Sequence, residues 1–255
     1  MSKAAAPALK TALVTGLNGR LAPHLKRALN EDDVEVVAFD RTRIDISNRD
    51  QQQALLISQN IDAIFHLATG PESWVGTLAG LAREQNIPFV FTSTESVFEP
   101  TSPGPFTPAH PADATSDYGQ YKIACEQAAC QAHPDTLIAR LGWQMFDTFD
   151  EDNLLTHVRD MHNEHGVLEA STTWLPAVAH VRHTMEALIQ LAREGATGTY
   201  HIDGNQNGLS FHDLVTLINR HHQMNWNIRK GTEPTRDGRI VDPRLSGSDI
   251  AACFK

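Results

Sequence analysis

The feature of this chain that most restricts its fold is an alternation of strand-like and helix-like segments over its first 140 residues. Short apolar runs at 11–15 and 34–39 flank a segment, 18–29, in which leucines recur every four residues. A short apolar run that ends at glycine predicts a buried strand, and apolar residues spaced three or four apart predict a helix. Strands that alternate with helices over short connections predict a doubly wound parallel sheet of the α/β class.

The same pattern continues along the chain and predicts how it is divided. Further strands are expected at 61–67, 88–91, 136–141 and 199–202, and further helices at 48–57, 75–85, 117–133, 181–194 and 211–221. Beyond Gly142 the periodicity is weaker, with mixed polar and aromatic residues as far as Trp174. We therefore expect a dinucleotide-binding Rossmann domain of residues 1–141 and about 181–203, and a substrate lobe of about 142–180 and 204–255.

Charge and cysteine content exclude several classes of function. Lys and Arg number 21 against 31 Asp and Glu, a net charge of −10, and no basic stripe is present. Binding to nucleic acid or to an anionic membrane is therefore not expected. The three cysteines form no C-x-x-C pair, and no apolar stretch is long enough for a membrane span, which predicts a cytoplasmic protein. The 13 histidines show no ligand spacing that closes into a metal site.

A glycine-containing loop follows the first expected strand and opens the first expected helix. Small residues in this position let the backbone approach a pyrophosphate, which then lies at the helix N-terminus. The loop thus predicts a dinucleotide site, and the residues expected to contact the cofactor are Gly16, Leu17, Asn18, Gly19, Arg20 and Leu21.

The end of the second expected strand supplies the evidence on the choice of cofactor. Asp40 lies 24 positions after Gly16, where a carboxylate would accept a hydrogen bond from the adenosine ribose. This favours NAD(H), because the 2′-phosphate of NADP(H) would meet a like charge. Arg41 and Arg20 argue the other way, since a guanidinium binds phosphate well. Two residues of the following loop, Asp45 and Ile46, are expected to cover the adenine.

A Thr, a Tyr and a Lys indicate chemistry at a carbonyl. Tyr118 and Lys122 are four residues apart on an expected helix and so share one face, and Thr94 ends the fourth expected strand. A phenol that transfers protons near neutral pH needs a pKa about 3 units below its usual value, or about 4 kcal/mol of preference for the phenolate. A neighbouring ammonium supplies part of that preference.

These segments together resemble the extended short-chain dehydrogenase/reductases, most of all the dTDP-4-dehydrorhamnose reductase group. The resemblance lies in TGLNGRLA (15–22), FVFTSTESVF (89–98), YGQYK (118–122), RLGW (140–143), GTYHI (198–202) and PRLSGSDI (243–250). It implies that Thr94 polarises a carbonyl, that Tyr118 transfers the proton, and that Lys122 holds the nicotinamide ribose. It also implies that hydride passes to or from an NAD(P) cofactor at a sugar or nucleotide-sugar carbon, and that the chain pairs into a homodimer.

The resemblance extends to the end of the third expected strand and also shows where the chain departs from its family. Leu67, Ala68 and Thr69 stand at the family's alanine-rich strand end and are expected to contact the cofactor. Ser73 replaces an Asn that supports the active-site helix in many members, and Glu95 replaces the group's Asp. Two alternatives therefore stay open: a sugar-nucleotide epimerase or dehydratase with tightly held NAD⁺, and a non-catalytic regulatory subunit that binds the cofactor.

Overall fold

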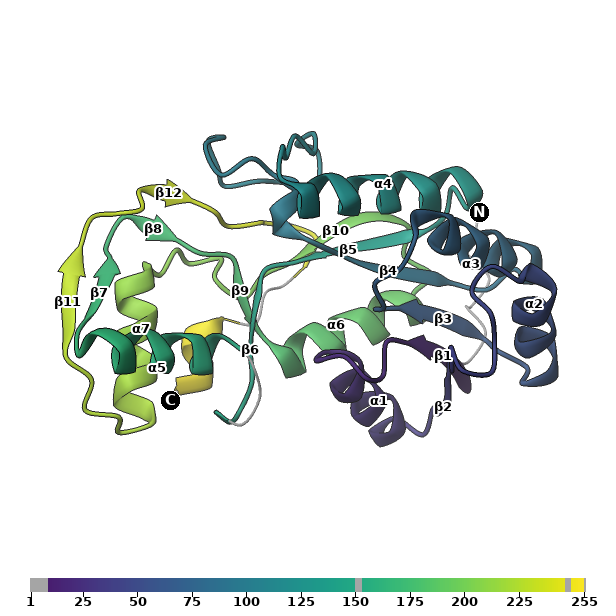
Figure 1. Cartoon of the computed structure of the whole chain (residues 1–255), viewed down its shortest axis with the longest axis horizontal. Helices are drawn as coiled ribbons and strands as arrows, with labels where there is room; N and C mark the ends of the chain where they lie inside the picture. Colours follow the sequence, from purple (N-terminus) through teal and green to yellow (C-terminus); the bar gives the residue numbers. More distant parts are fainter. Residues whose placement is uncertain (1–8, 150–152, 246–248, 255) are drawn as a thin grey trace. The chain divides into compact units, whose positions relative to one another are not determined.

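The computed structural model describes residues 9–149, 153–245 and 249–254. Six strands in this part of the chain form a central sheet in the order β10-β5-β4-β3-β1-β2, in which β1 pairs in parallel with β2 and β3, and β3 with β4 (Figure 1). These strands are β1 (Thr11–Thr15), β2 (Glu35–Ala38), β3 (Ala63–His66), β4 (Phe89–Thr94), β5 (Leu137–Leu141) and β10 (Gly198–Ile202).

Helices cover both faces of this sheet. In Figure 1, α3 and α4 lie against one face, and α1 and α6 against the other, where Arg193 and Asp32 form an ion pair of 2.8 Å. The doubly wound parallel sheet expected from the sequence is therefore confirmed. The helices of this part are α1 (Ala22–Glu31), α2 (Arg49–Ser58), α3 (Glu72–Gln85), α4 (Asp117–Ala132) and α6 (Val181–Arg193).

The strand order determines where a ligand can approach the sheet. From β1 the chain moves outward to β2 and then returns to β3 on the other side of β1. The loops that leave β1 and β3 therefore diverge, and open parallel sheets bind ligands at such a switch point, beyond the carboxyl ends of the strands. The strands beneath it are fully buried, with Leu13 and Ile64 at 0% exposure, as expected for a parallel sheet covered on both faces.

The boundaries of the elements follow from local chemistry. The Asn48 side chain accepts a hydrogen bond from Gln51 N and begins α2, and the Ser116 hydroxyl accepts one from Gly119 N and begins α4. The first helix starts later than the leucine spacing predicts, at Ala22 rather than at residue 18. The reason is that Gly16 has φ +82°, and its carbonyl accepts a hydrogen bond from Gly19 N at 2.7 Å, which forms a turn.

The chain divides into two compact units. The first comprises the described residues up to Ser93, with Ser116–Ala139 and Met185–Tyr200. The second comprises Thr94–Thr115, Arg140–Thr184 and the described residues from His201 onward. No helix among the described residues is long and apolar enough to cross a membrane.

The second unit has its own apolar core, to which Leu155, Val178 and Leu214 contribute. Three pairs of short parallel strands surround it, β6 with β9, β7 with β11, and β8 with β12. The sequence pattern did not indicate any of these six strands, because two to four residues are too few to show a periodicity. The elements are β6 (Trp143–Met145), α5 (Leu154–His165), β7 (Leu168–Ser171), β8 (Trp174–Leu175), β9 (Val178–His180), α7 (Phe211–His221), β11 (Ile228–Gly231), β12 (Arg236–Asp237), and the short 3₁₀ helices η1 (Glu95–Val97) and η2 (Ile250–Phe254).

Candidate functional site

The loop after β1 is built for close approach by another backbone. Gly16 has a positive φ, and a Cβ atom on it would lie 2.9 Å from Ala68 N. Only glycine meets both requirements without strain. No side chain caps the N-terminus of α1, which begins at Leu21 and Ala22. A helix N-terminus of this kind is suited to a phosphate group.

The hydroxyl of Thr15 holds the start of the loop after β3. Its oxygen accepts hydrogen bonds from Leu67 N and Ala68 N, both at 3.1 Å, and lies 3.2 Å from Nδ1 of His66. Because both acceptor positions of the hydroxyl are used, its proton is donated to His66 Nδ1, which places the single N–H proton of the neutral ring on Nε2. Burial, helped by the charges of Lys122 and Arg41, lowers the pKa of His66 to about 3, so the ring is neutral near neutral pH.

Two further side chains hold the end of the same loop. Arg41 donates a hydrogen bond from Nη2 to the carbonyl of Thr69, and its Cζ lies 4.7 Å from the centroid of the Trp74 ring. The Tyr121 hydroxyl donates to Gly70 O at 2.8 Å and accepts from Gly70 N at 3.1 Å. Of the cofactor residues expected from the sequence, Gly16, Arg41, Ala68 and Thr69 are therefore brought together here.

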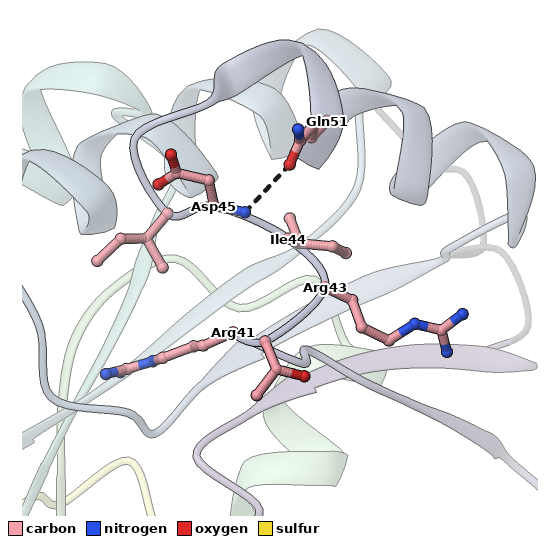
Figure 2. A pocket seen from close by; sticks show the side chains of 7 residues that line it. Arg41, Arg43, Ile44, Asp45 and Gln51 are labelled. Atoms are coloured by element: carbon pink, nitrogen blue, oxygen red, sulfur yellow. Dashed lines mark hydrogen bonds between the residues drawn. The ribbon is translucent and has the colours of Figure 1, made fainter.

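The loop after β2 lines an open pocket of about 460 Å³. Its walls come from seven consecutive or nearly consecutive residues, and Figure 2 shows Asp45 N donating to Gln51 Oε1 across it at 3.1 Å. The expected residues Asp45 and Ile46 line this pocket. Gln51 was not expected, although its place in the first turn of the helix after this loop was a usable signal. The lining residues are Arg41, Thr42, Arg43, Ile44, Asp45, Ile46 and Gln51.

Asp40 lies just before this pocket and is held by its own loop. Its Oδ1 accepts hydrogen bonds from Thr42 Oγ1 at 2.7 Å and from Thr42 N at 2.9 Å. These bonds lower the pKa of Asp40 below its usual value, and the bond from the Thr42 hydroxyl has the larger effect. The carboxylate is therefore ionised near neutral pH. The position is the one expected for a ribose-binding carboxylate at the end of the second strand.

The helix α4 presents the expected Tyr and Lys in contrasting surroundings. Tyr118 is 51% exposed, whereas Lys122 is buried. Lys122 Nζ donates to Thr92 O at 2.9 Å and lies 4.8 Å from the centroid of the Phe91 ring. Burial lowers the pKa of Lys122 from its usual value of 10.5. The ammonium is thus fixed one helical turn from Tyr118, on the same face of α4.

Thr94 belongs to the second unit, as the last residue of β4. Its hydroxyl accepts from Ser96 N at 3.1 Å and donates to Ser96 Oγ at 3.2 Å. The neighbouring Glu95 is mostly buried and lies 3.6 Å from Arg236 Nη2. Burial raises the pKa of Glu95, while the charge of Arg236 acts in the opposite direction.

Comparison with known proteins identifies the family. The model of the RmlD substrate binding domain matches residues 10–70 and 72–243. The chain belongs to this family. It is 25% identical, over 93% of its length and 85% of the relative's, to a dTDP-4-keto-6-deoxy-D-glucose reductase of Streptomyces niveus.

Solved structures share the fold of this chain. A dTDP-4-dehydrorhamnose reductase of Clostridium acetobutylicum has a TM-score of 0.79 at 19% identity, with 96% of this chain and 97% of that one covered. A dTDP-4-dehydrorhamnose reductase of Bacillus anthracis, in complex with NADP, has a TM-score of 0.75 at 20% identity, with 91% and 90% covered. Membership of the RmlD substrate binding domain family confirms the resemblance drawn from the sequence and the expectation of an oxidoreductase.

Five more of the residues that are expected to contact the cofactor lie in the loop after β1. Asn18, Gly19 and Arg20 are exposed, and Leu17 and Leu21 are half-buried.

Within the described residues, no three His, Cys, Asp or Glu side chains gather as a metal site would require. Sequence reasoning did not assign a role to Thr15 or Tyr121, whose partners lie more than fifty positions away.

Proposed function

We propose that this chain is an NAD(P)H-dependent reductase that converts a ketone of a nucleotide-linked sugar into an alcohol. The observation that carries the proposal is the pair on α4, an exposed Tyr118 and a buried Lys122 whose ammonium is fixed on Thr92 O. The family, and the sugar-nucleotide substrates in the names of its relatives, support the substrate class.

The residues present fit a nicotinamide dinucleotide. A Cβ at Gly16 would lie 2.9 Å from Ala68 N, so glycine lets the loop after β1 pack directly against the loop after β3, at the carboxyl ends of the two strands where dinucleotides bind. The uncapped N-terminus of α1 suits a pyrophosphate, and the pocket of about 460 Å³ after β2 suits an adenosine. When bound, the cofactor supplies the hydride for the carbonyl carbon. The NADP complex of the Bacillus anthracis relative supports this assignment.

Three side chains complete the proposed chemistry. As the carbonyl carbon gains hydride, its oxygen takes a proton from the Tyr118 phenol, and the alcohol forms. The positive charge on Lys122 favours the phenolate that remains, which is reprotonated from solvent. Thr94 polarises the carbonyl by giving it the hydrogen bond that its hydroxyl now donates to Ser96 Oγ.

We further propose that NAD(H) is preferred over NADP(H). Asp40 is ionised, and in the described chain Thr42 engages only its Oδ1, which leaves Oδ2 to accept from a ribose hydroxyl. The guanidinium of Arg41 donates to Thr69 O and lies over Trp74, so it is already engaged. A 2′-phosphate at Asp40 would meet a like charge. Tighter binding of NADPH than NADH in a fluorescence titration would contradict this preference.

The function is tested with Tyr118→Phe, which removes only the phenolic oxygen. Turnover of a dTDP-4-dehydro-6-deoxy sugar should fall by about 100-fold or more, the usual size of a general acid's contribution. Cofactor affinity should stay within a few-fold, because Tyr118 is proposed to act on the substrate. Tyr200→Phe is the matched control and should retain activity. Unchanged turnover in the Tyr118 variant would exclude the proposed role of this residue.

A further inference from the structure

The loop Leu67–Gly70, which joins β3 to α3, is held by side chains from three different elements. Thr15 of β1 accepts hydrogen bonds from the amides of Leu67 and Ala68. Arg41, after β2, donates to the carbonyl of Thr69. Tyr121 of α4 bonds to both backbone groups of Gly70. Every residue of this loop is thus fixed through its backbone, and the loop lies against Gly16 in the proposed cofactor site.

The contact made by Tyr121 determines the orientation of the loop at its last residue. One hydroxyl oxygen donates to Gly70 O at 2.8 Å and accepts from Gly70 N at 3.1 Å, which fixes the peptide groups on both sides of Gly70. Burial raises the pKa of Tyr121 above 10.0, so the proton needed for the donated bond is retained. Space at this point is limited, since a Cβ on Gly70 would lie 2.7 Å from the Trp74 ring.

Tyr121 also adjoins the residues proposed to act on the substrate. It precedes Lys122, whose Nζ lies 6.0 Å from the centroid of its ring, and the ring centroids of Tyr118 and Tyr121 are 6.5 Å apart. Helix α4 therefore carries both Tyr118, the proposed proton donor, and the Tyr121 hydroxyl, which holds the loop Leu67–Gly70. Any shift of α4 moves both together.

The packing of α3 on α4 does not depend on this hydroxyl. Gly76 and Gly80 of α3 face Ala128 and Ala132 of α4, and the ring of Tyr121 packs against the apolar core through its carbon atoms. A phenylalanine would keep these contacts. The oxygen of Tyr121 makes the two bonds to Gly70, which link α4 to the loop after β3, and a side-chain hydrogen bond with the Cys125 thiol one turn along the same helix.

We propose that Tyr121 is a positioning residue that holds Leu67–Gly70 in the conformation that binds the dinucleotide, and so couples cofactor binding to the helix that carries Tyr118 and Lys122. This inference rests on the proposed function of the same site. It concerns the phenolic oxygen of Tyr121 and not its ring.

The test is Tyr121→Phe, with Tyr200→Phe as the matched loss of a hydroxyl elsewhere. The Kd for NADH, followed by fluorescence, and the KM for NADH should both rise about 10-fold, the effect of losing one or two hydrogen bonds of ordinary strength. At saturating NADH, kcat should stay within about threefold, because the proton donor is intact. The control should leave Kd, KM and kcat unchanged.

The outcomes separate this inference from the proposed function. If the wild type binds neither NADH nor NADPH, the proposed function fails. If the wild type binds and the Tyr121 variant keeps its Kd and KM, with or without a lower melting temperature, the hydroxyl has a structural role only and the inference is overturned. A fall in kcat at unchanged KM overturns it as well.

A measurement on the unmutated residue covers the case in which the variant does not fold. With 3-fluorotyrosine in place of the three tyrosines, the ¹⁹F resonance of Tyr121 is assigned by comparison with the Tyr118→Phe and Tyr200→Phe proteins. Saturation with NADH should shift this resonance, because the loop it holds contacts the ligand. A resonance that does not move would overturn the inference.

Discussion

Gly16→Ala is expected to destabilise the fold by an amount that the structure allows us to divide into two parts. Gly16 has φ +82°, a conformation that costs a residue with a side chain about 1–2 kcal/mol. The new methyl group would also lie 2.9 Å from Ala68 N, and relieving such an overlap in a packed site costs about 1–3 kcal/mol more. The expected loss in the free energy of unfolding is therefore about 2–5 kcal/mol.

Gly195→Ala is the matched control for the backbone part. Gly195 also has a positive φ, +60°, but a Cβ there would find no atom within 4 Å. This variant should lose only the backbone part, about 1–2 kcal/mol, or about 2–8 °C in melting temperature for a chain of this size. Urea unfolding of the two variants and the wild type, followed by circular dichroism, measures both losses under identical conditions.

The comparison also tests the proposed site. Because the methyl group of the Gly16 variant would displace the Ala68 backbone, its affinity for NADH should fall by at least 10-fold, whereas the Gly195 variant should bind normally. Equal losses of stability in the two variants would refute the argument that Gly16 is required by close contact. Normal NADH binding by the Gly16 variant would refute the placement of the dinucleotide on this loop.

Two predictions concern pH. Burial raises the pKa of Asp203 from 3.8 to about 6. Between these two values the folded state holds a proton that the unfolded state releases. The free energy of unfolding should therefore fall by up to about 3 kcal/mol as pH rises from about 4 to about 6. Asp203→Asn should remove this slope in urea unfolding series, and a slope unchanged in the variant would contradict the assignment. His66 has the opposite sign: its pKa is lowered from 6.5 to about 3, so its contribution to stability is present above about pH 6.5 and is lost as pH falls toward 3. His66→Asn should therefore show a smaller loss of stability from pH 7 to pH 4 than the wild type, and an equal loss would show that the ring does not stay neutral.

The first unit could be predicted from the sequence because its signals are local. The run Thr11–Thr15 is apolar and ends at glycine, and it forms β1 within its predicted bounds. Ser116 stands three residues before Gly119, whose amide it caps, so the start of α4 also lies within one turn of sequence. Signals of this length are set by backbone sterics and by hydrogen bonds between near neighbours.

The second unit depends on partners that are far apart along the chain. Leu168 of β7 pairs with Ile228 of β11, and the Ser171 hydroxyl donates to Pro234 O across 63 positions. Glu95 meets Arg236 across a still longer separation. No periodicity marks such short strands, and no spacing marks such pairs, because the apolar core that they pack around is built from residues far apart in the sequence.

The two tyrosines of YGQYK show where sequence reasoning about a site stops. Tyr118 was selected because it lies four residues from Lys122, a separation that places both on one helix face. Tyr121 lies one residue from Lys122, and its bonding partner Gly70 is 51 positions away on another loop. A spacing rule within one helix can find the first tyrosine but contains no information about the second.

Arg41 extends this point from hydrogen bonds to charge. Its place after Asp40 suggested a ligand for a 2′-phosphate, because a sequence shows which charges are close to a predicted site. In the folded chain its guanidinium instead donates to Thr69 O and lies over the ring of Trp74, about thirty positions away. A cation held in this way stabilises the loop Leu67–Gly70 and is less available to a phosphate. The proposed preference for NADH therefore rests on the partners that Arg41 has in the fold, which its proximity to Asp40 in the sequence does not reveal.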